Sequence, residues 1–565
     1  MSNITTSRLV LVLGLAVCLL AGGCQARRGP TPPAGPTAIP VAAGDPRAGE
    51  RPSASLEVRN VPARLARPYS LEPVSDLLPF QAGLREGHKQ DVASLPLATS
   101  YRIEARLYES SRQVSARQEV RYSNRTARSL GEIYLRLLPN QPGQQGSLTV
   151  DAVAVQGRRA GWALAVDATV LRIEIEPPLL PGEFVRLMLE YRVQVPEGNP
   201  AGFGIFTYEN GVFSLDHFYP WIPVCDAEGW HLDAWNELGD PTYTDVAFYD
   251  VALTTPPEMQ VVGSGHLASV HLNADGSKRT RFLAGPMRDF QLVAARGLKS
   301  IESQADGIRV VSYYLGDHDE EGRRVLQYAI DALRIYQRRF GPYPYAELSL
   351  VEAPIRAVGM EYPGLVLIGS RVYRPAEGSR DLSLEFSVAH EVAHQWWYGL
   401  VGSDQQGEPW LDEALSNYAS ILYFEELYGP ERAKVEMEGA LWSAYWLAMA
   451  LGQDAPVRQP VDGFTKQNYY AIVYAKGALF FEALRQEVGD AVFDRILRAY
   501  YQEFKYRNAR SDDLMRIADR EAGRSLAELY ATWQVSATAV DLWAAALARR
   551  APLPADLAAA PAGRP

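Results

Sequence analysis

The sequence is poor in cysteine and has no excess of basic residues. Only three cysteines, Cys18, Cys24 and Cys225, occur among 565 residues, which excludes the disulfide-rich frameworks of small secreted domains. Lysine and arginine number 56 against 67 acidic residues, a formal net charge of -11. A nucleic-acid partner is therefore not expected, because such binding needs a basic stripe. Hydrophobic residues make up 47% and charged residues 22%, so we expect a globular chain of more than one domain.

Long apolar runs are absent except for one near the start. Leu9–Ala21 is apolar over 13 residues and follows a single basic residue, Arg8. This run is too short for a stable bilayer span but suits the core of a signal peptide. It ends in Ala21-Gly-Gly-Cys24, and small residues directly before a cysteine resemble a bacterial lipobox, although Ala21 stands where leucine is usual. The resemblance implies a signal peptide at 1–23 and acylation of Cys24.

The alternative for this segment is an ordinary secretory signal with an incidental cysteine. We expect the lipid anchor, because Cys24 follows the apolar run closely and seven prolines lie within residues 25–60. Such a proline-rich segment favours an extended tether between a membrane and a folded domain. The protein is thus predicted to be an extracytoplasmic, membrane-anchored lipoprotein of the cell envelope.

The hydrophobic period of the chain changes once downstream of the tether. Apolar and polar residues alternate in segments such as Tyr101–Tyr108, which predicts strands. From about residue 322 apolar residues recur at helical spacing, first in Arg323–Arg339. The predicted fold class is α+β multidomain, with an all-β sandwich-like domain before a mainly helical one. The sequence does not decide whether residues 61–99 belong to the tether or to the domain that follows. The predicted segments are a tether at 24–97, a β domain at 98–298, a second domain at 299–549 and a disordered tail at 550–565.

The most informative stretch is a predicted helix late in the chain. Asp381 is its expected N-cap, and apolar residues continue at helical spacing to Trp397. His390-Glu391-Val-Ala-His394 is an H-E-x-x-H motif, and positions i and i+4 of a helix lie on one face. Two imidazoles placed in this way can bind one Zn²⁺, with Glu391 close enough to polarise a metal-bound water.

A second predicted helix offers a third ligand. Glu408-Pro-Trp-Leu-Asp-Glu413 opens it with acidic residues in the first turn, and Gly429-Pro430 follows its end. Glu413 lies 19 positions after His394, and a loop between antiparallel helices would bring its carboxylate to the metal. The fourth position would remain for water, the open geometry of a catalytic zinc site.

These residues resemble the gluzincin metallopeptidases of the aminopeptidase N family. The resemblance begins with His390-Glu391-x-x-His394 and, after 18 residues, Glu413 within Trp-Leu-Asp-Glu-Ala. It covers about residues 98–545. It implies a thermolysin-like catalytic domain, one Zn²⁺ per chain, and hydrolysis of N-terminal residues from peptides by attack of zinc-bound water.

Two flanking motifs are similar to those of the same family. Ala357-Val-Gly-Met-Glu-Tyr362 is similar to its Gly-Ala-Met-Glu-Asn motif, although Val358, Gly359 and Tyr362 stand where the family has Gly, Ala and Asn. Tyr474-Ala-Lys-Gly477 is similar to its Tyr-Glu-Lys-Gly motif.

The resemblance assigns the chemistry to particular side chains. It implies that His390, His394 and Glu413 are zinc ligands and that Glu391 is the general base. Glu391 would take a proton from zinc-bound water and pass it to the leaving amine. Tyr474 would donate its phenol to the tetrahedral oxyanion, and Tyr469 and Tyr470 are nearby competitors for this role.

Substrate recognition is expected from the upstream motif. Glu361, with Met360 and Gly359 beside it, would bind the free α-amine of the substrate through opposite charges in a desolvated cleft. The family often has a second amine-binding residue in the β domain. Its alignment here falls on Ser214, with Asp216 near.

The resulting prediction is a zinc-dependent aminopeptidase with peptide substrates and a membrane contact through its lipid anchor. An endopeptidase with the same zinc site and a non-catalytic peptide-binding lipoprotein are the alternatives, and the intact Glu391 argues against the second. Either Asp412 or Asn417 could orient a ligand histidine, and the sequence leaves this choice open.

Overall fold

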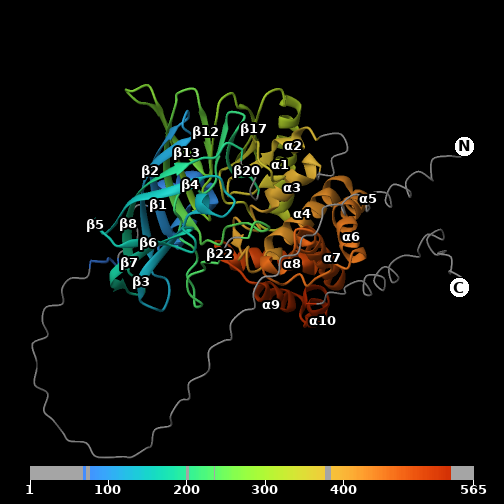
Figure 1. The fold of residues 1–565 in the computed structure, drawn as a ribbon. Coiled ribbons are helices and arrows are strands. Elements are labelled where there is room, and N and C mark those ends of the chain that lie inside the picture. Colours follow the sequence, from blue (N-terminus) through green and yellow to red (C-terminus); the bar gives the residue numbers. More distant parts are fainter. Residues whose placement is uncertain (1–67, 72–76, 199–202, 234–235, 376–382, 536–565) are drawn as a thin grey trace, which may run out of the picture. The chain divides into compact units, whose positions relative to one another are not determined.

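The computed structural model describes residues 68–71, 77–198, 203–233, 236–375 and 383–535 (Figure 1). The predicted signal peptide, Cys24, most of the predicted tether and the predicted tail therefore lie outside the described residues. All the described residues belong to one structural unit, Leu65–Pro565. They form a β-rich first half and a mainly helical second half, which confirms the predicted fold class.

An eight-stranded sheet is the largest layer of the first half, in the order β13-β14-β11-β1-β2-β8-β4-β5. Buried and less buried residues alternate along β1, because successive side chains of a strand point to opposite faces. β1 is antiparallel to β2 and parallel to β11, so Tyr101 lies between Val120 and Tyr249. The strands are β1 (Thr99–Tyr108), β2 (Gln113–Ser123), β4 (Ser147–Val155), β5 (Arg158–Arg159), β8 (Phe184–Gln194), β11 (Ala247–Thr255), β13 (His266–Leu272) and β14 (Lys278–Met287).

Two smaller sheets complete this half. The three-stranded sheet β3-β7-β6 shares one buried apolar cluster with the large sheet, so the two layers enclose a common core. The four-stranded sheet has the order β12-β15-β10-β9. The strands are β3 (Leu130–Arg136), β6 (Trp162–Ala165), β7 (Val170–Leu179), β9 (Phe206–Glu209), β10 (Val212–Leu215), β12 (Gln260–Gly263) and β15 (Leu292–Ala295).

The second half begins with a five-stranded sheet in the order β16-β17-β18-β20-β19. β17, β18 and β20 are parallel, and helix α1 (Asp319–Arg339) connects the first two of them. The edge strand β19 runs antiparallel to β20 and carries Gly359 and Met360. The strands are β16 (Lys299–Ala305), β17 (Ile308–Tyr314), β18 (Glu347–Ala353), β19 (Gly359–Met360) and β20 (Leu365–Gly369).

Helices make up the rest of the second half. The short parallel pair β21 (Val401–Gly402) and β22 (Arg507–Asn508) joins the segment after α3 to the segment before α9. The α-helices are α2 (Ser370–Tyr373), α3 (Leu384–Ala393), α4 (Trp410–Tyr428), α5 (Pro430–Glu436), α6 (Ser443–Ala450), α7 (Gly477–Val488), α8 (Asp490–Phe504), α9 (Ser511–Ala522) and α10 (Ala527–Tyr530). The 3₁₀ and π segments are η1 (Leu78–Gly83), η2 (Glu86–Ser94), η3 (Leu138–Asn140), η4 (Met437–Trp442), η5 (Val461–Gly463), η6 (Tyr470–Lys476) and η7 (Ala531–Val535).

The metal-motif helix is shorter than predicted at both ends. It begins at Leu384, and Ser383 rather than Asp381 is its N-cap. The Ser383 hydroxyl accepts a hydrogen bond from the backbone N–H of Phe386 at 3.1 Å, which satisfies one of the free donors of the first turn. The helix ends at Ala393 and not at Trp397.

The predicted tether boundary at residue 97 is wrong. Residues 77–97 include η1 and η2 and bury Phe80, Leu84 and Val92 against the folded body. Arg85, between the two segments, donates to the side chain of Gln337 at 2.7 Å. Apolar burial and a polar contact to α1 hold this stretch on the domain, so the part of 61–99 that is described belongs to the folded unit.

Candidate active site

Helix α3 presents both histidines of the H-E-x-x-H motif on one face. Residues from Phe386 to Ala393 are buried without interruption. His390 lies in the last turn, and His394 at the C-cap keeps a right-handed helical conformation. The i, i+4 relation therefore survives although the helix stops between the two residues.

Three ligand atoms converge at this face. His390 Nε2 and His394 Nε2 lie 3.0 Å apart, and each lies 3.3 Å from Glu413 Oε2. A tetrahedral zinc ion with bonds of about 2.0–2.1 Å would separate its ligand atoms by about 3.3 Å. Among the residues that the structure describes, these three form the one cluster of histidine, cysteine or acidic side chains that could hold a metal ion. The donor set and its spacing fit zinc, as the sequence predicts.

Helix α4 brings Glu413 to this point from its first turn. Burial acts against the charged carboxylate, but the adjacent imidazoles of His390 and His394 hold the pKa of Glu413 well below its ordinary value. The carboxylate is thus ionised and ready to bind a cation. Its second oxygen, Oε1, accepts a hydrogen bond from the Tyr474 hydroxyl.

A backbone carbonyl fixes one ligand imidazole. His394 Nδ1 lies 3.0 Å from Trp397 O, and a carbonyl oxygen can only accept, so Nδ1 carries the proton. Nε2 is then the free lone pair that a metal needs. The turn after α3 therefore selects the tautomer of its own ligand.

Asn417 lies beside the other ligand imidazole. Burial lowers the pKa of His390, while contacts with Glu413 and Asn417 act in the opposite direction. Asp412, the other candidate for orienting a histidine, accepts hydrogen bonds from Gln405 Nε2 at 2.7 Å and from the backbone N–H of Glu413 at 2.9 Å. Asp412 is thereby engaged at the start of α4. Asn417 donates to the backbone oxygen of Tyr474 at 3.3 Å, and no described residue forms a hydrogen bond with His390 Nδ1, so the choice between the two residues stays open.

Glu391 faces the edge strand β19. Its side chain is 5% exposed, and its Oε2 has no hydrogen-bond partner among the described residues. A Cβ placed on Gly359 would lie 2.3 Å from Glu391 Oε1, so the absence of a side chain at Gly359 makes room for this carboxylate. Burial, followed by repulsion from Glu361, raises the pKa of Glu391 well above its ordinary value.

Three tyrosines, Tyr469, Tyr470 and Tyr474, lie near the metal cluster. Among the described residues, Tyr474 is the one of the three whose hydroxyl donates a hydrogen bond to the Glu413 carboxylate. It lies in the π segment η6, and π segments often occur at functional sites. Its ring stacks on the His390 ring at a centroid distance of 6.1 Å. The Tyr470 hydroxyl donates instead to a backbone carbonyl of η4 at 3.3 Å, and the Tyr469 ring packs edge-on against Tyr474.

The turn that carries Glu361 is tied to the metal-binding segment. Gln395, directly after His394, donates to the backbone oxygens of Glu361 and Tyr362 at 3.3 and 3.2 Å. Its Oε1 accepts a hydrogen bond from Gly364 N at 2.8 Å. Burial raises the pKa of Glu361 to about 7. Gln395 is a positioning residue that the sequence analysis does not single out.

Ser214 and Asp216 serve as supports in this structure. Ser214 Oγ accepts a hydrogen bond from Gln291 Nε2 at 3.0 Å. Asp216 pairs with His217 at 2.6 Å and accepts a hydrogen bond from the Tyr362 hydroxyl at 2.7 Å. The tyrosine that replaces the family's asparagine therefore anchors the Glu361 turn to the β half.

A further carboxylate beside Glu361 has no signal in the sequence. Asp240 is 6% exposed and lines a small cavity together with Met360 and Glu361. None of the described residues forms a hydrogen bond or an ion pair with its carboxylate. Burial, followed by repulsion from Glu361 and Glu413, raises its pKa well above the ordinary value. It stands in a connecting loop with no motif around it, so only the folded chain reveals it.

The site as a whole is a pocket of negative charge. Buried carboxylates are stable only when they are paired or bind a cation. A divalent metal ion would offset part of this charge. The buried carboxyl groups are Asp240, Glu361, Glu391, Asp412 and Glu413.

Known proteins resemble this chain in sequence over about half of its length. The model of the peptidase family M1 domain matches residues 325–533. Rice aminopeptidase M1-B is 26% identical over 293 residues, 50% of this chain and 32% of that protein. Human endoplasmic reticulum aminopeptidase 2 is 26% identical over 276 residues, 47% of this chain and 28% of that protein. The chain therefore spans about a third or less of the length of these relatives.

Solved structures reproduce the fold over a longer stretch. An M1 zinc metallopeptidase variant from Deinococcus radiodurans superposes with a TM-score of 0.59 at 21% identity, covering 78% of this chain and 96% of that one. The same enzyme variant bound to a Tyr-Ser-Ala substrate gives a TM-score of 0.58, also at 21% identity. Residues 325–533, which hold the cluster of two histidines and a glutamate, thus match the peptidase family M1 domain, and the chain shares the fold of these M1 zinc metallopeptidase structures.

Proposed function

We propose that this protein is a zinc-dependent aminopeptidase that removes N-terminal residues from peptides. The observation that carries the proposal is the arrangement of buried carboxylates around one metal-binding cluster. Glu413 completes a zinc-type ligand set, Glu391 is free of hydrogen bonds at one oxygen, and Glu361 and Asp240 share a cavity. These groups supply a metal site, a base and a receptor for a positive charge.

The residues of the chain divide the chemistry between them. Zinc bound by the two histidines and Glu413 would supply a Lewis acid that polarises a carbonyl and acidifies water. Glu391 Oε2 accepts the proton of the attacking water and then delivers it to the nitrogen of the leaving amine. Desolvation raises the pKa of Tyr474 well above its ordinary value, so its phenol stays protonated as a donor to the developing oxyanion.

Recognition of a free N-terminus follows from the carboxylates of Glu361 and Asp240. An ammonium group pairs with them, whereas an acylated N-terminus leaves them buried and unpaired. Sites that bind a polar group in this way discriminate strongly against analogues that lack it, by about 10⁴ in favourable cases. This preference separates the proposal from an endopeptidase with the same zinc site.

The test uses the purified full chain, metal analysis and paired peptide substrates. We expect one zinc per chain, hydrolysis that a chelator abolishes and zinc restores, and rates on free peptides far above those on N-acetylated ones. Glu391→Gln should keep the zinc and lose about 10³-fold in kcat. Glu385→Gln, on the same helix but bonded to Tyr423, is the matched control. Equal rates on free and acetylated peptides would exclude amine recognition, and an active Glu391→Gln enzyme would exclude the mechanism.

We also propose that Cys24 carries a lipid anchor on the outer side of a cell membrane. The support is the apolar run Leu9–Ala21 that ends just before this cysteine. Among the described helices none is long and apolar enough to cross a bilayer. Cells given a labelled fatty acid should label the wild-type protein and not Cys24→Ser, which should leave the membrane fraction. Equal labelling of both proteins would contradict the anchor.

A further inference from the structure

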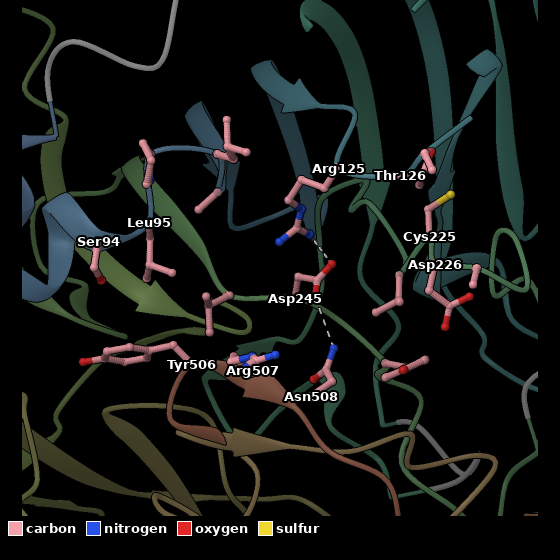
Figure 2. Close-up of a pocket in the computed structure, with 18 of the residues that line it drawn as sticks. Ser94, Leu95, Arg125, Thr126, Cys225, Asp226, Asp245, Tyr506, Arg507 and Asn508 are labelled. Atoms are coloured by element: carbon pink, nitrogen blue, oxygen red, sulfur yellow. Dashed lines mark hydrogen bonds and ion pairs between the residues drawn. The ribbon is translucent and has the colours of Figure 1, made fainter. Parts of the chain in front are cut away.

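A second cavity shares no lining residue with the metal centre (Figure 2). Its volume is about 930 Å³, in the range of sites that bind small molecules. Segments far apart in the sequence meet around it, from the end of η2 to the stretch before α9. These segments are 94–98, 125–128, 224–227, 243–246 and 506–510.

The walls of this cavity are cationic in a chain whose net charge is -11. Four arginines and two aspartates line it, so the lining residues carry a formal charge of 4 − 2 = +2. The local sign is therefore opposite to that of the whole protein. The charged residues are Arg125, Arg128, Arg507, Arg510, Asp226 and Asp245.

Two of the four arginines are already neutralised. Arg125 forms an ion pair with Asp245, drawn in Figure 2. Arg510 pairs with Asp226 at 3.3 Å and with Glu228 at 2.9 Å. Their guanidinium groups hold the cavity walls together and offer little free charge.

The other two arginines have no carboxylate partner among the described residues. Arg128 donates to the backbone oxygen of Asp226 at 3.1 Å. Arg507 stacks its guanidinium over the Phe504 ring at 5.6 Å, which restrains the side chain without neutralising it. Both side chains are exposed, and a guanidinium group can bind a planar or tetrahedral anion through two hydrogen bonds.

The backbone under Arg507 is held rigidly. The buried guanidinium of Arg288 donates to the backbone oxygens of Arg507, Thr244 and Tyr398 at 2.6, 2.9 and 2.5 Å. Two cavity segments are thereby fixed to each other before any ligand arrives. A site formed in advance loses less conformational entropy on binding.

The remainder of the lining is largely apolar. Leu95, Val224, Val246 and the rings of Tyr243 and Tyr506 contribute to it. We propose that this cavity binds a small organic anion, in which a carboxylate or phosphate group is attached to an apolar body. Arg128 and Arg507 bind the charged group, and the aliphatic and aromatic side chains pack on the apolar body.

Cys225 provides a local reporter of occupancy. Its half-buried thiol lies on the cavity wall in Figure 2, and burial raises the pKa of this thiol to about 11. Only the thiolate reacts with a maleimide, so alkylation at mildly alkaline pH is slow and can be followed. A bound ligand should shield the sulfur, which an anion on the catalytic zinc could not do.

The experiment titrates the full chain with hexyl phosphate, hexanoate and inorganic phosphate. Calorimetry gives affinities, and mass spectrometry of the peptide that holds Cys225 gives alkylation rates. We expect a hexyl compound to bind more tightly than inorganic phosphate and to slow Cys225 alkylation several-fold. The tighter of the two hexyl compounds identifies the preferred anionic group.

The matched variants are the double substitution Arg128→Gln with Arg507→Gln, and Arg117→Gln on an exposed site of β2. The double variant should lose affinity about tenfold or more, and Arg117→Gln should bind as the wild type does. All three arginines are exposed, so unchanged melting temperatures are expected. Unaltered affinity in the double variant, unprotected Cys225, or inorganic phosphate binding as tightly as both hexyl compounds would overturn the proposal.

Discussion

Replacing Gln395 by methionine tests whether the metal helix positions the amine-binding carboxylate. The Gln395 side chain is fully buried and makes three hydrogen bonds to the turn that carries Glu361. Methionine has a similar length and volume but can make none of them. The change therefore removes polar contacts while leaving little empty space.

The loss of stability can be worked out from the partners. Tyr362 O keeps a second hydrogen bond, from Leu365 N at 3.0 Å. Gly364 N and Glu361 O are left without the Gln395 amide, and each unsatisfied buried group costs about 1–3 kcal/mol. The variant should therefore lose about 3 kcal/mol of unfolding free energy. Because the turn is no longer fixed, KM for peptides with a free amine should rise about tenfold, with a smaller change in kcat.

Urea denaturation and steady-state kinetics measure these two effects, and metal analysis shows whether His394 still binds zinc. Gln502→Met, at an exposed position of α8, should change stability by less than about 0.5 kcal/mol. If Gln395→Met lost less than about 1 kcal/mol and kept its KM, the three hydrogen bonds would not hold Glu361 in place, and the reasoning would be refuted.

Three further predictions address other contacts. Tyr474→Phe should lower kcat about 10²-fold with zinc retained, whereas Tyr470→Phe, whose hydroxyl bonds a backbone carbonyl, should stay active; equal rates would remove Tyr474 from the mechanism. Asp240→Asn should raise KM for free peptides about tenfold, and Glu237→Gln, on the same loop but paired with Lys466, should not; an unchanged KM would exclude Asp240 from amine binding. Arg288→Met should cost about 3–5 kcal/mol in urea denaturation, because several backbone oxygens lose their donor, and a loss below about 1 kcal/mol would contradict this.

The metal ligands could be predicted because their geometry is largely local. The spacing of His390 and His394 places them one helical turn apart wherever the helix forms. Glu413 stands at the start of α4, and acidic residues at a helix start are themselves a local signal. The exact helix limits were harder to predict, since Ser383 and Asp381 are both good caps and only the hydrogen bond to Phe386 distinguishes them.

Residues that meet through tertiary contacts gave no such signal. Gln395 reaches the turn at Gly364 across 31 positions, and nothing in its neighbourhood shows which backbone it will contact. Ser214 likewise forms its hydrogen bond with a distant residue, Gln291, and its role in amine binding stays a prediction.

Asp240 shows why an energetic conflict can be a better guide to function than a motif. Nothing in the sequence distinguishes an isolated aspartate in a loop. The free-energy cost of its negative charge arises only when folding buries the side chain near Glu361 and Glu413. Such a cost persists in a folded protein when a bound cation offsets it. Asp245 forms an ion pair with Arg125, whereas none of the described residues forms an ion pair with Asp240. The position of that unpaired charge, next to a metal-binding cluster, is therefore itself an argument that the substrate supplies the missing cation.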